Sequence, residues 1–91
     1  MSLNRFNPRR DKNEKDIVDY FKRIGFSVAR LNTPLDLLVG YKKRNYLVEV
    51  KMPGKKLNDN QVEFVDEWKG QYIVISSIED AQQFADGVRL A

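Results

Sequence analysis

Two acidic residues and one lysine carry the clearest chemical signal in this sequence. Asp36 precedes a basic turn, whereas Glu49 and Lys51 follow it and are separated by one residue. The segments on either side of the turn have strand character, so a hairpin would bring Asp36 close to Glu49 and Lys51. Two adjacent carboxylates repel each other and are best stabilised by a hard divalent cation such as Mg²⁺. Such a cation can lower the pKa of a bound water and clamp a phosphodiester.

Each of these residues also has a purely structural explanation. Alternation along segment 46–52 puts Glu49 and Lys51 on one face with Leu47, and the more apolar residues on the other. If this segment were an edge strand, Glu49 and Lys51 would be an ordinary surface ion pair. Asp36 taken alone is typical of a turn or strand start. We expect a central strand instead, where two such charges are costly unless they are paired or used.

The elements that must position these residues follow from hydrophobic spacing and from the glycine and proline positions. We predict helices over 11–25, 58–69 and 79–86, the last ended by Gly87, and strands over 26–31, 36–41, 46–52 and 71–76. A basic turn over 42–45 would join the second and third strands. The order α-β-β-β-α-β-α contains one β-α-β crossover, which predicts a parallel pair within a mixed sheet flanked by helices. The fold class is therefore α/β, with a basic arm over 1–10 and a single domain over 11–91.

Composition excludes several classes of function. The chain of 91 residues is one domain at most, and it contains neither cysteine nor histidine. Disulfide scaffolds, zinc sites built on cysteine or histidine, and Ser–His or Cys–His nucleophiles are therefore excluded. We find no glycine-rich phosphate loop, so no nucleotide cofactor is expected. Since no apolar run reaches about 20 residues and no signal peptide is recognised, we expect a cytoplasmic protein without membrane contact.

Charge is divided unevenly along the chain. Residues 1–56 hold 14 Lys and Arg against 6 Asp and Glu, which gives +8, whereas residues 57–91 hold 2 against 7, which gives −5. A basic face on a small domain suggests a phosphate backbone as the partner, although a solvated surface explains the same charges equally well.

The pattern Asp36…Glu49-Val50-Lys51 resembles the Asp…(Asp/Glu)-X-Lys signature of the PD-(D/E)XK nuclease superfamily. More narrowly, segments 36–40 and 46–51 are similar to the small stand-alone VRR-NUC nucleases of phages and bacteria, which are Holliday-junction-resolvase-like. The similarity covers about residues 11–85 and includes 13–14, 55–57 and Gln61. One difference is that the family has Pro directly before its aspartate, whereas Leu35 separates Pro34 from Asp36 here.

The resemblance implies a restriction-endonuclease-like sheet and a set of site residues. By this analogy, Asp36 and Glu49 bind Mg²⁺ or Mn²⁺ together with the Val50 carbonyl, and Lys51 orients or activates the attacking water. It also implies roles near the metal for Glu14 and Gln61. Helix-dipole stabilisation of Glu14 and a capping box between Asn58 and Gln61 are the alternatives.

The expected partners are DNA and a second copy of the chain. Lys55, Lys56, Arg9 and Arg10 are candidates for phosphate contacts. The interpretation that we favour is a structure-specific DNA endonuclease acting on branched DNA such as four-way junctions. The alternatives are a non-catalytic nucleic-acid-binding domain on the same fold and a structural adaptor with a solvated basic face. The resemblance implies a homodimer, with Tyr20, Tyr41, Val88 and Leu90 as interface candidates. We expect Trp68 and Tyr72 in the core rather than as platforms for base stacking.

Overall fold

The structure of this protein is a computed structural model that describes residues 11–91. The arm predicted for 1–10, with Arg9 and Arg10, lies outside the described residues. The elements are α1 (Glu14–Arg23), β1 (Ser27–Arg30), β2 (Leu37–Tyr41), β3 (Arg44–Val50), α2 (Asp59–Glu67), β4 (Tyr72–Ile75) and α3 (Ile78–Leu90). The predicted order α-β-β-β-α-β-α is confirmed, and so is the α/β class.

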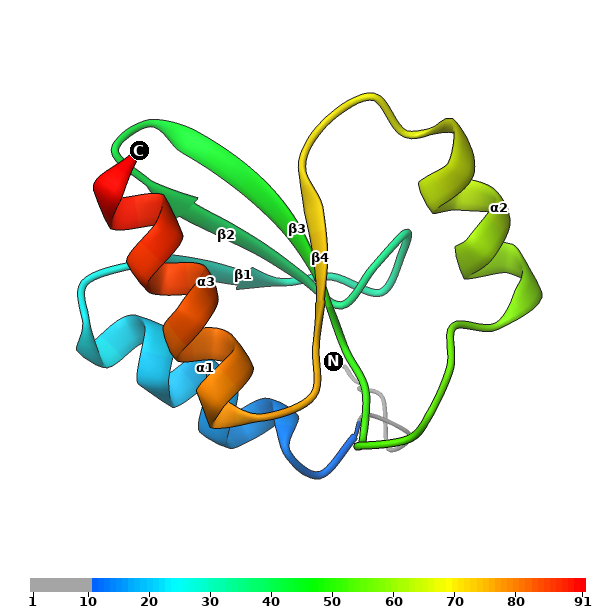
Figure 1. The fold of residues 1–91 in the computed structure, drawn as a ribbon, viewed down its shortest axis with the longest axis horizontal. Coiled ribbons are helices and arrows are strands. Elements are labelled where there is room, and N and C mark those ends of the chain that lie inside the picture. Colours follow the sequence, from blue (N-terminus) through cyan, green and yellow to red (C-terminus); the bar gives the residue numbers. More distant parts are fainter. Residues whose placement is uncertain (1–10) are drawn as a thin grey trace, which may run out of the picture.

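Within the described residues, the strands form one mixed sheet in the order β1-β2-β3-β4. The pairs β1–β2 and β2–β3 are antiparallel, and β3 pairs with β4 in parallel after the crossover through α2. Strand β3 is therefore central, which confirms the prediction for the strand that carries Glu49. Helices α1 and α3 cover one face of the sheet and α2 lies over the other (Figure 1).

The hydrophobic core lies between the sheet and the α1–α3 pair. Helix α1 contributes Ile17, Val18 and Phe21 at helical spacing, and Phe21 stacks on Phe26 at 5.8 Å between ring centroids. The sheet contributes Leu37, Val39, Val48, Val50 and Ile75, all fully or nearly fully buried. Because the residues of β3 alternate between its faces, burial of Val48 and Val50 turns Leu47 and Glu49 toward α2.

The turn between β2 and β3 is tighter than predicted. Tyr41 pairs directly with Arg44, so the loop consists of Lys42 and Lys43, with φ angles of 51° and 65°. Left-handed backbone at both central positions is the hairpin geometry that matches strand twist, although Asn-Gly is its usual sequence. Two lysines do not indicate a two-residue loop in the way that Asn-Gly does. The sequence therefore predicted a longer turn, over 42–45.

Helix α3 is longer than predicted and does not end at Gly87. It begins after Ser77, whose side chain accepts a hydrogen bond from the Asp80 backbone N–H, and continues to Leu90. A glycine inside a helix costs about 1 kcal/mol relative to alanine. Burial of Ala81, Ala85 and Val88 against α1 and the sheet offsets that cost.

The face covered by α2 is packed much less tightly. Within Asp59–Glu67 no residue is buried. Trp68 and Tyr72 are each 42% exposed, so the prediction that they belong to the core is wrong. The helical stripe of Phe64, Val65 and Trp68 is present, but the short helix stands off from the sheet. In the described part of the chain, no helix has the length and apolar character needed to cross a membrane.

Candidate metal-dependent active site

The β2–β3 hairpin places Asp36 opposite Glu49. Leu37 pairs with Val48, so continuing the antiparallel register by one position sets Asp36 against Glu49. The Val50 backbone N–H donates a 3.0 Å hydrogen bond to Asp36 Oδ2. Leu35, buried directly before Asp36, anchors the approach to this position despite the residue inserted after Pro34. The two acids that the sequence predicted to converge therefore do so.

Glu49 is buried on the central strand, with 3% of its surface exposed. Its Oε2 accepts a 2.7 Å hydrogen bond from Gln61 Nε2 and lies 3.4 Å from Lys51 Nζ. Its Oε1 is also buried, and no residue in 11–91 donates a hydrogen bond to it. The alternative of a surface ion pair on an edge strand is wrong, and one buried carboxylate oxygen has no donor among residues 11–91.

The electrostatics of the site disfavour two negative charges without a cation. Burial raises the pKa of Glu49 to about 7, and the neighbouring Asp36 carboxylate adds to the rise. Lys51 and the Gln61 hydrogen bond act in the opposite direction on this pKa but do not cancel the effect of burial. A divalent cation bound between the acids would remove the repulsion and favour the ionised form of Glu49.

Gln61 caps α2 and also contacts the acid on the central strand. Its backbone N–H donates to Asn58 Oδ1 at 2.9 Å, and its Oε1 accepts from the Asn58 backbone N–H at 3.0 Å, which completes a capping box. Its Nε2 remains available and binds Glu49. Capping and positioning of the acid are therefore properties of one side chain, because a primary amide has an acceptor and two donor hydrogens.

The start of α1 holds the end of β3 in place, which the sequence analysis did not predict. Asn13 Nδ2 donates to the backbone carbonyls of Lys51 at 3.1 Å and Ser76 at 3.0 Å. Asp11 Oδ2 accepts a 2.9 Å hydrogen bond from the Met52 N–H. The Lys51 N–H in turn donates to the Ile75 carbonyl at 3.0 Å. These contacts fix the backbone that carries Lys51.

Glu14 lies on the inward face of α1, as expected. It forms an ion pair with Arg30. It is 2% exposed, and its Oε2 lies 3.2 Å from Arg30 Nε. Within residues 11–91, no three acidic side chains form a group that could hold one metal ion, so Glu14 does not join Asp36 and Glu49 in such a group. A role for Glu14 near the metal stays a prediction, and the sequence gave no indication of Arg30 as its partner.

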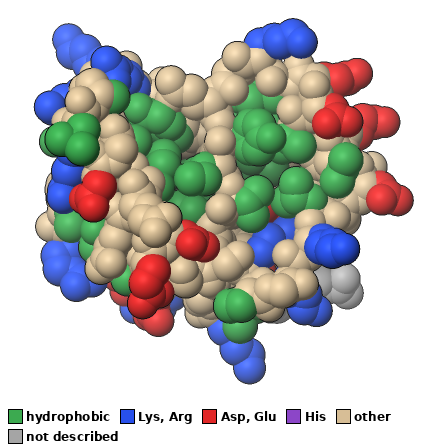
Figure 2. Space-filling view, viewed as in Figure 1, with side chains coloured by type: hydrophobic (Ala, Val, Ile, Leu, Met, Phe, Trp, Pro, Cys, Tyr) green, Lys and Arg blue, Asp and Glu red, His purple; other side chains and the backbone are tan. Residues whose placement is uncertain are grey.

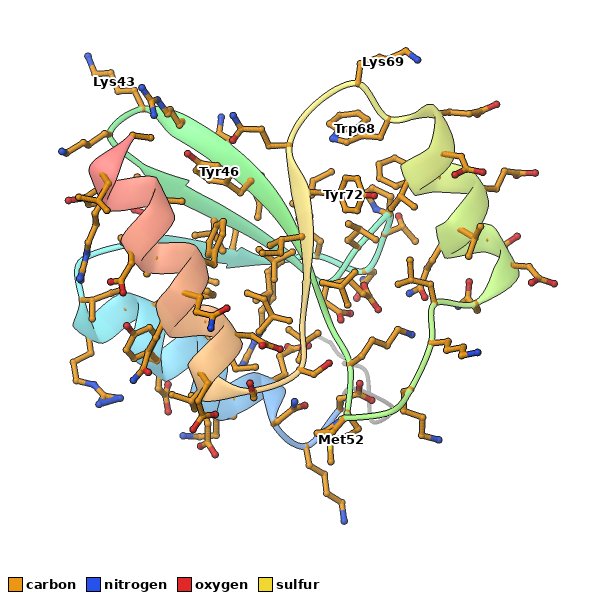
Figure 3. The ribbon with its side chains drawn as sticks, viewed as in Figure 1. Lys43, Tyr46, Met52, Trp68, Lys69 and Tyr72 are labelled. Carbon is orange, nitrogen blue, oxygen red and sulfur yellow. The ribbon has the colours of Figure 1, made fainter. Side chains whose placement is uncertain are left out.

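The loop after β3 carries two exposed lysines at the same end of the strand as Lys51. Pro53 and Gly54 form a turn closed by the Lys55 N–H donating to the Met52 carbonyl at 3.0 Å, and Gly54 has a φ of 84°. Proline followed by a glycine with positive φ is the signature of a type II turn. Lys55 and Lys56 follow Lys51 by four and five residues, so they are close to it along the chain. The turn that contains Lys43 lies at the opposite end of the hairpin (Figure 3).

The donor set suits a hard divalent cation. Asp36 and Glu49 supply carboxylate oxygens, one of them buried without a donor among residues 11–91. In a strand, the N–H and C=O of one residue point to the same side, so the Val50 carbonyl lies on the side of Asp36. Two carboxylates, a carbonyl and water are a coordination set that Mg²⁺ accepts. Comparisons with family models, with curated proteins and with solved structures find no match to this chain.

Proposed function

We propose that this protein is a Mg²⁺- or Mn²⁺-dependent DNA endonuclease that hydrolyses phosphodiester bonds, with branched DNA such as four-way junctions as its substrate. One observation carries the proposal: Glu49 is buried opposite Asp36 with one oxygen lacking a donor in the described chain, and Lys51 lies beside it. An unsatisfied buried polar atom costs about 1–3 kcal/mol, and a cation bound at Glu49 Oε1 would remove that cost.

Asp36, Glu49 and the Val50 carbonyl would hold the cation. A bound divalent ion supplies Lewis-acid polarisation of the phosphate and lowers the pKa of water. The protein's own contribution is orientation. The Val50 N–H holds Asp36 through Oδ2, and Gln61 holds Glu49 through Oε2, whereas Glu49 Oε1 has no donor among residues 11–91. Such supporting hydrogen bonds keep ligating carboxylates in one orientation and raise metal affinity.

Lys51 is the charged donor of the proposed site. Its ammonium is mostly buried, and its backbone is held from both sides by Ile75 and Asn13. A positioned ammonium stabilises the negative charge that develops on the phosphate oxygens in the transition state and can orient the attacking water. The chain has no histidine, so this lysine and the two acids are the groups through which protons and charge would be managed.

The proposed substrate follows from charge and from symmetry. Lys55 and Lys56 are exposed at the same end of β3 as the site and would contact phosphates on either side of the cut. Symmetric cleavage of a four-way junction requires two active sites, which a two-fold dimer supplies. The interface candidates need correction, because Tyr20, Tyr41 and Val88 pack against the chain's own core. Leu90 is 88% exposed and remains available.

The test is cleavage of labelled single-stranded, duplex, flap and four-way-junction DNA with and without Mg²⁺ or Mn²⁺. We expect cleavage only with metal and faster cleavage of branched than of linear duplex DNA. Glu63→Gln, an exposed change on α2, is the matched control and should cleave like the wild type. If none of the four substrates is cut with either metal, the nuclease proposal fails. Salt-dependent DNA binding that persists without cleavage would then favour the non-catalytic binding domain.

A further inference from the structure

A second feature lies on the same face of the sheet as Glu49. A cleft of about 450 Å³ opens between the sheet and the α2–β4 connection, with Leu38 and Leu47 as its floor and Trp68 as a wall. Leu47 precedes Glu49 by two residues on the same face of β3, which corresponds to about 7 Å along the strand. The cleft and the proposed metal site are therefore neighbours on one continuous surface.

The tryptophan at this cleft is held in position although 42% of it is exposed. Phe64 stacks against it at 5.2 Å between centroids, and its Nε1 donates to the Gln71 carbonyl at 3.4 Å. Gly70 permits this placement, since a Cβ there would lie 2.8 Å from Trp68 Nε1. Two contacts therefore hold this exposed ring, and the close approach of Gly70 allows them. An aromatic ring held in one orientation can stack on a nucleobase with little loss of side-chain entropy.

The cleft is mainly apolar, and the charges around it are of both signs, with Lys69 next to Trp68 and four acidic residues on α2. Tyr72 pairs in register with Leu47, so it lies on the same face, and Figure 3 shows Trp68 and Tyr72 in the space between β4 and α2. Figure 2 shows hydrophobic side chains gathered there, with Lys and Arg side chains above and below them and Asp and Glu side chains along the right side. Asn45 and Gln71 add polar groups to the lining. An apolar cleft with an exposed aromatic ring and a few polar groups in its lining matches the face and the edge of a nucleobase.

We propose that this cleft binds one unpaired nucleobase of the substrate strand, stacked against Trp68, while an adjacent phosphate lies at Asp36, Glu49 and Lys51. This inference rests on the proposed function of the latter site. Helix α2 connects the two, because Gln61 binds Glu49 near its start and Trp68 follows its end, about 10 Å away along the axis. A base that is stacked and paired in a continuous duplex cannot enter, so the cleft favours cutting at branch points, where a nucleotide beside the cut is unpaired or more easily unstacked.

Trp68 is the single tryptophan of the chain, so intrinsic fluorescence reports directly on the cleft. The experiment titrates the full-length protein, with a chelator present to prevent cleavage, with three probes: a single-stranded oligonucleotide, the same strand made abasic throughout, and a blunt duplex. Stacking of a base should quench Trp68 with the first probe only. Trp68→Ala should weaken binding of the base-bearing strand by about 10- to 100-fold and leave binding of the abasic strand unchanged.

Two further variants separate stacking from a general loss of structure. Gly70→Ala keeps the indole but displaces it, so it should also weaken binding of the base-bearing strand. Gln82→Ala changes an exposed side chain on α3 and should have no effect. Equal quenching by all three probes, or by none, overturns the inference. It is also overturned if Trp68 emission responds to protein concentration and not to DNA, which would assign the cleft to a second copy.

The outcomes also distinguish this inference from the proposed function. If the protein cleaves DNA with metal but Trp68 fluorescence is not quenched selectively by the base-bearing strand, the nuclease proposal is supported and the base-binding cleft is refuted. Selective quenching by the base-bearing strand in a protein that cuts no DNA would support the cleft and remove the nuclease.

Discussion

The amide of Gln61 binds Glu49 Oε2 at 2.7 Å while its carbonyl oxygen accepts from the backbone of Asn58, the residue that caps α2. The start of this helix is therefore tied to the acid on the central strand. Because no residue within Asp59–Glu67 is buried, polar contacts of this kind contribute much of what positions α2 over the sheet. A change at Gln61 should alter both the helix and the site, whereas a change at Asn58 should alter mainly the helix.

This difference gives the first prediction. Asn58→Ala removes the capping acceptor and should lower the free energy of unfolding by about 1 kcal/mol, with cleavage close to wild type. Gln61→Ala should lower stability by a similar amount and also reduce the cleavage rate by about 10- to 100-fold, since a supporting contact of a ligand is lost. Denaturant unfolding and single-turnover cleavage measure the two effects. Equal loss of rate in both variants would show that Gln61 acts through the cap alone.

The second prediction concerns Lys51. Lys51→Ala should lower the cleavage rate by about 10²–10⁴-fold, the range for a positioned charge or proton-transfer group. Calorimetric binding of Mn²⁺ should persist, because the ammonium is not a ligand. If Lys51→Ala instead abolishes Mn²⁺ binding, the role of Lys51 is to hold the carboxylates in place rather than to stabilise the transition state.

The third prediction concerns the pH dependence of stability without metal. The pKa of Glu49 rises from 4.5 to about 7 on folding, so the unfolded chain loses this proton at lower pH than the folded protein does. Below pH 4.5 both forms are protonated and the group has no effect. As the pH rises from 4.5 to 7, folding becomes less favourable, by about 3 kcal/mol at most. Glu49→Gln should lack this loss.

Urea unfolding at pH 5 and pH 8 in a chelator measures this difference. Relative to the wild type, Glu49→Gln should be clearly more stable at pH 8 than it is at pH 5. If the free energy of unfolding changes with pH in the same way in the wild type and in the variant, the buried Glu49 carboxylate does not destabilise the folded protein. The electrostatic argument for a cation at this position would then be lost.

The fourth prediction concerns Asn13, which connects the ends of β3 and β4. Asn13→Ala leaves the carbonyls of Lys51 and Ser76 without this donor and should lower stability by about 1–3 kcal/mol. Lys15→Ala, on the same helix, removes an exposed ion pair with Asp19 and should change stability by less than about 1 kcal/mol. Thermal unfolding compares the two. Similar small effects in both would mean that Asn13 does not stabilise the strand ends.

The sequence predicted the order of elements, the hairpin and the parallel pair, because these follow from hydrophobic periodicity and from Gly and Pro positions. It also predicted the convergence of Asp36 with Glu49, since a short turn fixes which strand ends meet. The extent of α3 was missed because Gly87 is a strong local stop signal, and the packing of Ala85 and Val88 overrides it. Local propensity carries no information on such tertiary compensation.

Two features of the site could not be predicted from periodicity. Asn13 binds carbonyls that are 38 and 63 residues away in the chain, and no local pattern specifies such partners. Trp68 lies on an apolar helical stripe that is typical of a core position, yet α2 stands off from the sheet and leaves it exposed. Whether an amphipathic helix packs closely depends on the loops that hold it, and these are the least predictable part of the chain.

The most direct test of the proposed metal site is cleavage of a labelled four-way junction in Mg²⁺ or Mn²⁺ by the wild type, Asp36→Asn, Glu49→Gln and the control Glu63→Gln. Both site variants should remain folded, as circular dichroism can verify, and should show no cleavage because each removes ligand charge from a hard-cation site. The control should match the wild type. Cleavage by a folded Asp36→Asn or Glu49→Gln protein within about tenfold of the wild-type rate, a change in barrier of less than about 1.4 kcal/mol, would contradict the assignment.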